Sequence, residues 1–224
     1  MNAGFILAVD TSTRSSVIVA GAGAPSAVSR REVQHRHGSH VLEQIDEALA
    51  EAGATLGDVT GLAVGTGPGS FTGLRVGLAT LKTIAYARSL PLVGVMSSDA
   101  LRRAGAEAGA APDAAVVLPA GARDHYLARA GEDPVLIAPG ELPEAIADGA
   151  LLAVDTEPDV LGNEATRLGR AAVAGMPSAL LALARERFEA GEQDDVAELI
   201  PAYVALPRGV KRAAEDLGWS PDLR

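Results

Sequence analysis

The chain lacks cysteine, is poor in aromatic residues and has no long apolar run. None of its 224 residues is Cys, and aromatic residues make up only 3%. Disulfide scaffolds, thiol nucleophiles and zinc sites with cysteine ligands are therefore excluded. The first apolar run follows no Lys or Arg and is interrupted by Asp10, unlike a signal peptide, and no run approaches the ~18 residues of a membrane span. We expect a cytoplasmic protein with no membrane partner.

Basic residues are also outnumbered. The chain has 19 Lys and Arg against 29 Asp and Glu, a formal net charge of -10. Binding to a phosphate backbone normally depends on several Lys or Arg contacts, and binding to single strands on aromatic stacking. We therefore expect no direct sequence-specific binding to nucleic acid. If the protein serves a nucleic acid, it does so through another subunit.

The order of the apolar segments predicts an α/β fold with two lobes. Three short strands form a meander and are followed by alternating helices and strands, which is typical of parallel crossovers. Small residues near 105–112 mark a boundary, so we predict an N-terminal lobe of residues 1–106 and a C-terminal lobe of 107–224, with the last segment a candidate to pack back on the first lobe. The predicted strands are 5–9, 16–20, 27–34, 61–65, 91–95, 114–118, 124–130, 135–138 and 151–154, and the predicted helices are 39–52, a long one ending near Arg88, 97–106 and 178–190.

A glycine-rich turn precedes the long helix. Glycine permits backbone angles closed to other residues, and the start of a helix offers free amides that favour an anion. The turn lacks the motifs of a Walker A loop and of a dinucleotide-binding loop. Its spacing leaves two interpretations open, a tight turn for packing or a contact with a ligand or partner. Its residues include Gly65, Gly67, Pro68, Gly69, Ser70, Phe71, Thr72 and Gly73.

A second polar turn follows the first strand. Asp10, Thr11 and Ser12 offer a carboxylate and hydroxyls that are able to serve phosphates or magnesium. A phosphate-binding turn would want a glycine here to bring the backbone close, and Ser12 stands in its place. We interpret these residues as a degraded phosphate turn or a simple polar turn.

Histidines gather at one junction. His35, His37 and His40 lie within six residues, but Arg36 separates the first two and no H-E-x-x-H motif is present. Exposed histidines before a helix are the favoured interpretation, and no metal site is predicted.

The long helix carries a stripe of apolar residues. Gly73 and Gly77 lie four apart beside Leu74, Leu78 and Leu81. Small residues at this spacing let another helix approach closely. The stripe packs either on the protein's own core or on a partner, and we predict two contact faces on this helix.

Taken together, these segments resemble the TsaB family. The resemblance is carried by ILAVDTSTRSS, HGSHVLEQIDEALAEAG, AVGTGPGSFTGLRVGLATLKTIAYA and PLVGVMSSDAL, and covers roughly residues 5–103. It implies a two-lobed fold like that of actin, hexokinase and the Hsp70 ATPase, with RNase H-like lobes. It also implies a paralogue, TsaD, the catalytic subunit that joins threonylcarbamoyl-adenylate to the tRNA adenosine beside the anticodon.

The resemblance further implies a subunit without catalytic residues. In TsaD-like proteins two histidines four residues apart bind metal, and the matching positions here are Ser97 and Leu101. No cofactor is expected on this chain, with ATP and metal on the partner. The implied partners are TsaD directly, TsaE as part of the complex, and a second copy when the chain is alone. The implied contact residues are Leu74, Val76, Leu78 and Leu81, with Val41 and Ile45 on the preceding helix.

Two enzymatic interpretations compete with this one. A TsaD-like or kinase-like ATP-dependent enzyme would use Asp10 and the glycine-rich turn, and predicts magnesium-dependent ATP binding by the isolated chain. A metalloprotease would use the histidines and predicts a bound metal.

Overall fold

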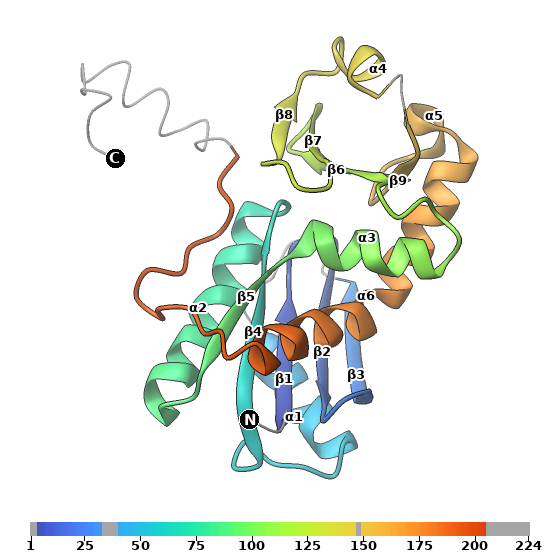
Figure 1. Ribbon diagram of the computed structural model, residues 1–224. Coiled ribbons are helices and arrows are strands. Elements are labelled where there is room, and N and C mark those ends of the chain that lie inside the picture. Colours follow the sequence, from blue (N-terminus) through green and yellow to red (C-terminus); the bar gives the residue numbers. More distant parts are fainter. Residues whose placement is uncertain (1–3, 33–39, 147–148, 205–224) are drawn as a thin grey trace, which may run out of the picture.

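The computed structural model describes residues 4–32, 40–146 and 149–204. These residues form two lobes, each built on a mixed β-sheet, which confirms the predicted α/β class (Figure 1). The first lobe contains β1 (Phe5–Asp10), β2 (Ser15–Gly21), β3 (Pro25–Glu32), α1 (Val41–Glu51), β4 (Val59–Gly67), α2 (Phe71–Arg88), β5 (Leu92–Met96) and α3 (Ser97–Glu107). The rest of the chain contributes β6 (Ala115–Ala120), β7 (Asp124–Ala128), β8 (Val135–Ile137), α4 (Leu142–Ala145), β9 (Leu151–Ala153), α5 (Pro158–Leu161) and α6 (Asn163–Glu189).

The two sheets repeat one pattern of connections. The first has the order β3-β2-β1-β4-β5, with an antiparallel meander from β1 to β3 and parallel pairing of β1 with β4 and β4 with β5. The second has the order β8-β7-β6-β9, again an antiparallel meander joined to a parallel strand, β9. The repeated meander and crossover are what the predicted RNase H-like lobes require.

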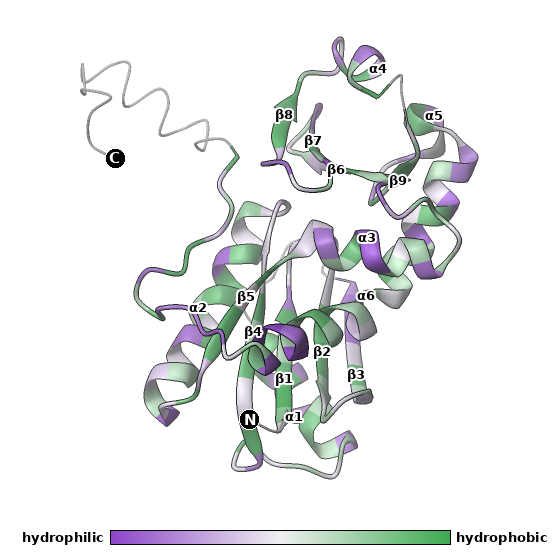
Figure 2. Cartoon of the chain, in the orientation of Figure 1, coloured by the Kyte–Doolittle hydropathy of each residue, from purple (hydrophilic) through white to green (hydrophobic). Residues whose placement is uncertain are grey.

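The first sheet is covered on both faces, so its central strands are apolar throughout. Successive side chains of a strand point to opposite faces. In β1, Leu7 and Val9 pack with α1 and α2, whereas Ile6 and Ala8 pack with α3 and α6. Figure 2 shows the resulting hydrophobic colour along β1 and β2, which contrasts with the hydrophilic end of α6. Helices α1 and α2 therefore lie on one face of the sheet, and α3 and α6 on the other.

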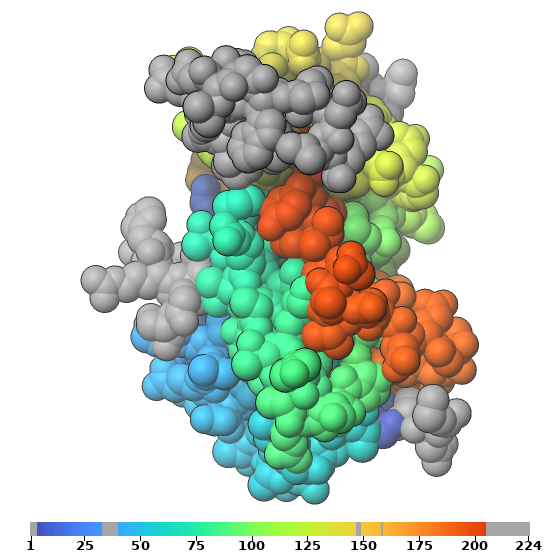
Figure 3. All heavy atoms as spheres, turned by 90° about the vertical axis from the view of Figure 1, so that its left-hand side faces the viewer, coloured from blue at the N-terminus to red at the C-terminus, as the bar shows by residue number. Residues whose placement is uncertain are grey.

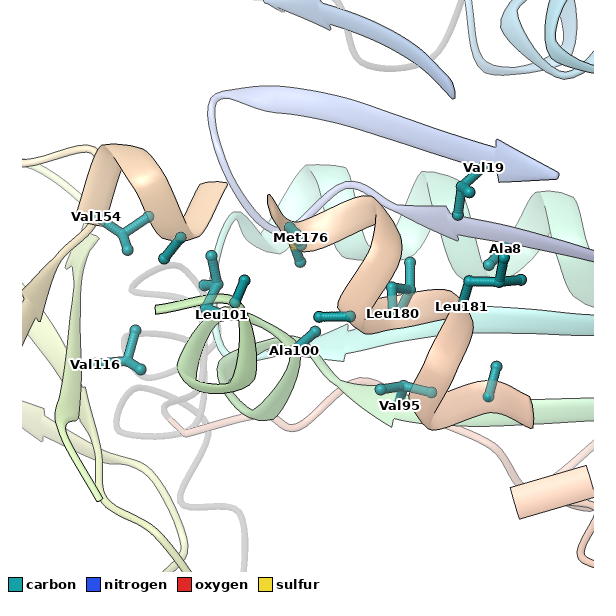
Figure 4. Packing of buried hydrophobic residues seen from close by; sticks show 14 of the residues in the cluster. Ala8, Val19, Val95, Ala100, Leu101, Val116, Val154, Met176, Leu180 and Leu181 are labelled. Atoms are coloured by element: carbon teal, nitrogen blue, oxygen red, sulfur yellow. The ribbon is translucent and has the colours of Figure 1, made fainter. Parts of the chain in front are cut away.

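Helix α6 links the lobes. It has 27 residues, about 40 Å of helix, and its side chains share a core with α3 and with both sheets. Figure 4 shows α3 and α6 between Ala8 and Val19 of the first sheet and Val116 and Val154 of the second. Pro177 lies inside this helix and has no N–H to donate to the carbonyl of Val173. The Arg30 guanidinium from β3 donates to that oxygen at 2.7 Å and to the carbonyl of Ala174 at 2.9 Å, so a side chain replaces the missing backbone donor.

After α6 the chain returns to the first lobe along the edge of β5. We call residues 191–203 the strap. The Asp194 N–H donates to the Leu92 carbonyl at 2.8 Å, and the Asp194 carboxylate accepts from the Gly94 N–H and from the Arg187 guanidinium. Farther on, the Ala202 N–H donates to the Thr66 carbonyl at 2.8 Å. The strap thereby covers a strand edge that would otherwise present unpaired backbone groups.

Candidate functional site

The carboxylate of Asp10 is buried and fully engaged by the chain itself. Asp10 ends β1 and is 0% exposed. One of its oxygens accepts from the N–H of Ser12 at 2.8 Å and from the Ser12 hydroxyl at 2.6 Å. The other accepts from the Ser97 hydroxyl, at the start of α3, at 2.5 Å. Three neutral donors therefore surround a group that the first strand places at the junction of the sheet and two helices.

The glycine-rich turn is bonded directly to this junction. The N–H of Gly67 donates to the Ser97 hydroxyl oxygen at 3.0 Å, and the N–H of Ser70 donates to the Ser12 carbonyl at 2.7 Å. The Gly69 backbone runs so close to Ser12 that an added Cβ would lie 2.2 Å from the Ser12 carbonyl oxygen. Here the lack of a side chain permits a close approach between two segments of backbone.

The start of α2 is held by the same contacts. The Thr11 hydroxyl donates to the Gly73 carbonyl at 2.7 Å, and the Ser70 hydroxyl caps the helix by accepting from the Gly73 N–H at 3.1 Å. The amides of Gly67, Ser70 and Gly73 are therefore all used within the protein. These three bonds fit the interpretation of a tight turn for packing, and a contact of the turn with a ligand or partner stays a prediction.

The donor groups around Asp10 do not fit a metal ion. Ser97 donates to Asp10, and Leu101, one turn later on α3, is 0% exposed within the core. Among the residues that the structure describes, no group of three or more His, Cys, Asp or Glu is placed to hold a metal. One carboxylate whose oxygens already accept three hydrogen bonds is a poor site for a cation that prefers six or more oxygen ligands.

Burial raises the pKa of Asp10, against the hydrogen bonds from Ser12 and Ser97, which lower it. A carboxyl group whose pKa is higher in the folded than in the unfolded protein lowers the free energy of unfolding as the pH rises from the unfolded-state pKa to the folded-state pKa. That interval begins near 3.8, the ordinary pKa of Asp.

We therefore expect the unchanged chain to lose stability relative to Asp10→Asn as the pH rises above about 4. Urea unfolding of both proteins at several pH values measures this difference, and the other carboxyls cancel from it. A difference that is flat or that rises with pH would contradict a raised pKa for Asp10.

The histidine cluster is only partly described. His35 and His37 lie outside the described residues. The His40 side chain is exposed, and its Nδ1 lies 3.2 Å from the Glu43 carboxylate on α1.

The structure places the predicted contact residues within the single chain. Most of them point into the protein's own core, not outward: Leu74, Leu78 and Leu81 are 3%, 6% and 0% exposed. Val41 and Ile45 on α1 are buried as well, and only Val76 is partly exposed. The leucine stripe covers the sheet of the same chain, and a contact of these residues with a partner stays a prediction.

The outer face of α2 carries a different row of residues. Thr72, Ala79 and Thr83 are exposed and lie in line with the partly exposed Val76. Thr72, Val76, Ala79 and Thr83 follow the spacing i, i+4, i+7 and i+11, so they share one side of the helix. We call these four residues the outer row. None of them is charged, although the chain has a net charge of -10. Of this row, the sequence analysis named only Val76 as a contact residue, because small and β-branched residues do not stand out as an apolar stripe.

The surroundings of the outer row differ on its two sides. Figure 3 shows α2 across the middle of this face, with α1 on one side and the strap, in orange-red, on the other. The outward side of α1 carries Glu43, Asp46 and Glu47, although Leu42 is 62% exposed. Near the strap, Tyr86 is 86% exposed. The outer row therefore lies between α1, where Arg31 pairs with Glu43 and Glu47, and the strap, which exposes both apolar and acidic side chains.

Comparison with known proteins places the chain in a family. The family model described as TsaD, tRNA N6-adenosine threonylcarbamoyltransferase, matches residues 28–158. A Haemophilus influenzae protein named tRNA threonylcarbamoyladenosine biosynthesis protein TsaB is 33% identical over 131 residues, which cover 58% of this chain and 55% of that protein. The chain belongs to the TsaB family. The match spans about half the length of this TsaB relative.

Other relatives extend the similarity over nearly the whole chain. An uncharacterized protein of Mycobacterium tuberculosis is 30% identical over 216 residues, covering 90% of this TsaB-family chain and 92% of that protein. A crystal structure from Pseudomonas aeruginosa, described as an uncharacterized protein with similarity to peptidase YeaZ, superposes with a TM-score of 0.69 at 22% identity. The superposition covers 90% of this chain and 100% of the Pseudomonas aeruginosa chain. The shared fold confirms the predicted two-lobed, actin-like and Hsp70-like architecture. No helix within the described part of the chain is long and apolar enough to cross a membrane.

Proposed function

We propose that this chain serves tRNA threonylcarbamoyladenosine biosynthesis as a non-catalytic subunit that binds a catalytic subunit of the TsaD type. The process is supported by the TsaB name of its relatives and by the match to the TsaD family model. The non-catalytic role is supported by the hydrogen bonds that occupy both carboxylate oxygens of Asp10 within the chain; we call this arrangement the closed Asp10 junction. The observation that carries the binding role is the outer row on α2, four uncharged and at least partly exposed residues on an acidic protein.

The closed junction argues against the competing ATP-dependent enzyme. An enzyme of this kind would need Asp10 or the amides of the glycine-rich turn to contact phosphates or their magnesium ion. Here Asp10, Gly67, Ser70 and Gly73 all bond to other groups of the chain. ATP and metal would then be held by the TsaD-type subunit, and the isolated chain would bind little or no ATP.

The outer row offers a suitable contact for a helix of the partner. Threonine, valine and alanine side chains are short, so a partner helix is able to approach closely and exclude water from apolar area. The same row would pair two copies of this chain in the absence of a partner. In the cytoplasmic complex TsaE would join through TsaD, and tRNA would bind to the other subunits.

Placing a charge in the outer row tests the proposal. With Ala79→Arg combined with Thr83→Arg, we expect binding to the TsaD-type subunit of the same organism to weaken by at least about 30-fold, roughly 2 kcal/mol, because two buried guanidinium groups would lack partners. Calorimetry with purified subunits measures the affinity, and an assay of tRNA threonylcarbamoylation measures the consequence.

Ser178→Arg is the matched control for this test. Ser178 is exposed on α6, which covers the opposite face of the first sheet, so the same chemical change should leave binding unaltered. Full affinity and modification activity in the Ala79→Arg, Thr83→Arg protein would show that the contact lies elsewhere. Turnover by the isolated chain would overturn the non-catalytic role.

A further inference from the structure

The strap presents two exposed apolar side chains on a firmly held backbone. Ile200 is 63% exposed and Tyr203 is 48% exposed, whereas Pro201 between them is buried. The Lys82 ammonium group, from α2, donates to the carbonyl oxygens of Ala197 at 3.0 Å and Leu199 at 3.1 Å. Beyond Pro201, Ala202 is bonded to Thr66. Both sides of Ile200 are therefore fixed to the first lobe, and the side chain is held outward.

The end of the strap is continuous with the start of α2. The Tyr203 ring lies 5.5 Å from the ring of Phe71, the first residue of α2, in a tilted arrangement. The Arg75 guanidinium lies 5.3 Å from the centre of the Phe71 ring. Contacts between aromatic rings and between a cation and a ring add to the stability of such a cluster. The cluster joins the strap to the helix that carries the outer row, and Figure 3 shows the strap beside α2.

The size of the outer face of α2 indicates that more than this helix takes part in the contact. A helix of 18 residues is about 27 Å long, and one side of it about 10 Å wide gives a strip of roughly 270 Å². A stable interface needs about 800 Å² on each partner. Aromatic residues are enriched in the centre of interfaces and charged residues are depleted there. On the strap side, Ile200 and Tyr203 add exposed apolar area next to α2, although Asp195 and Glu198 of the strap are exposed as well.

We propose that Ile200 and Tyr203 are anchors at one end of the docking face and are covered by the same TsaD-type subunit that contacts the outer row. This inference rests on the proposed function. Tyrosine is among the residues that contribute most at interfaces, and a side chain already held in place loses little freedom on binding. Lys82 is then a positioning residue, since it fixes the strap without itself reaching the partner.

The test compares charge substitutions in the strap with a control of similar exposure. Ile200→Glu combined with Tyr203→Glu should weaken binding to the TsaD-type subunit at least about 10-fold. Lys82→Met, which frees the strap and leaves both anchors in place, should weaken it about 3-fold. Val160→Glu, on α5 and 49% exposed, should leave it unchanged. Ile200→Glu alone keeps the test valid if the double variant is unstable, because Ile200 is the more exposed of the two.

The outcomes separate this inference from the proposed function. If Ala79→Arg with Thr83→Arg weakens binding but the strap variants bind fully, the docking face ends at α2 and the strap proposal is wrong. If the strap variants disrupt only pairing of two copies of this chain, seen by sedimentation, the occupant is a second copy and the proposal is again wrong. If neither set of variants weakens binding, the contact lies elsewhere, and the strap proposal is wrong together with the outer-row assignment. If the unchanged chain does not bind the TsaD-type subunit at all, the proposed function itself fails.

Discussion

Replacing Gly65 with alanine is expected to lower the free energy of unfolding by about 3 kcal/mol or more. Gly65 lies in β4 beside the Asp10 junction. An added Cβ would lie 1.7 Å from a carboxylate oxygen of Asp10 and 2.9 Å from the Ser97 hydroxyl oxygen. Asp10 has no free space to move into, since Ser12 and Ser97 bond both of its oxygens. The methyl group would have to break those bonds inside the core, where an unpaired carboxylate is costly.

Urea unfolding measures this effect, as a shift of the midpoint at constant slope. Gly140→Ala is the control, because no atom lies within 4 Å of its added Cβ, and we expect a change within about 0.5 kcal/mol. The cause is tested by a double-mutant cycle with Asp10→Ala. If the collision with Asp10 is the cause, Gly65→Ala will cost about 2 kcal/mol less once the carboxylate is gone. Equal costs in both backgrounds would mean that the strain arises elsewhere.

The strands of the first lobe and the long helix after the glycine-rich turn could be predicted from the sequence. Segments such as Phe5–Val9 are continuous apolar runs because both faces of the sheet are covered, and such runs stand out against polar turns. The meander and the crossovers followed from their order.

Helix α6 could be predicted only in its second half. The sequence prediction began this helix at Ser178, directly after Pro177, whereas the structure begins it at Asn163. Proline ordinarily ends a helix because it lacks an N–H. The donor that satisfies the carbonyl of Val173 is Arg30, 143 residues earlier in the chain, so no local pattern reveals that the helix continues.

The candidate site shows a second limit. The leucines of α2 form a clear stripe, but periodicity shows only that this side of a helix is covered, not by what. The structure packs Leu78 and Leu81 on the sheet of the same chain, whereas Ala79 and Thr83 on the opposite side are exposed. Ser97 is a similar case, since the resemblance marked it only as the position of a lost metal ligand. In the structure Ser97 forms hydrogen bonds with Asp10, 87 residues earlier, and with Gly67, 30 residues earlier. Contacts over such distances along the chain depend on the fold and could not be predicted from the local sequence.

The second large effect is expected from Gly169→Ala in α6. An added Cβ would lie 2.0 Å from the carbonyl oxygen of Ala153 and 3.0 Å from its nitrogen. These are backbone atoms of β9, which cannot turn aside as a side chain would. Relief requires the helix to move away from the second sheet, but Leu180 and Leu181 of the same helix are packed in the core with the first sheet. We expect a loss of about 3 kcal/mol or more in the free energy of unfolding, despite the higher helix propensity of alanine.

Gly175→Ala provides the matched control for this prediction. It is the same change in the same helix, but its added Cβ would lie 3.1 Å from the Cβ of Ala104, a contact that a small shift of α3 relieves. The gain in helix propensity, up to about 1 kcal/mol, should offset that shift, so the net effect stays within about 1 kcal/mol. Thermal and urea unfolding of the two variants give the comparison. If both substitutions lower the free energy of unfolding equally, α6 is free to move relative to β9. In that case α6 does not connect the two lobes rigidly. If only Gly169→Ala is costly and its folded protein still binds the TsaD-type subunit, the connection between the lobes serves stability, while docking depends on the opposite face of the first sheet.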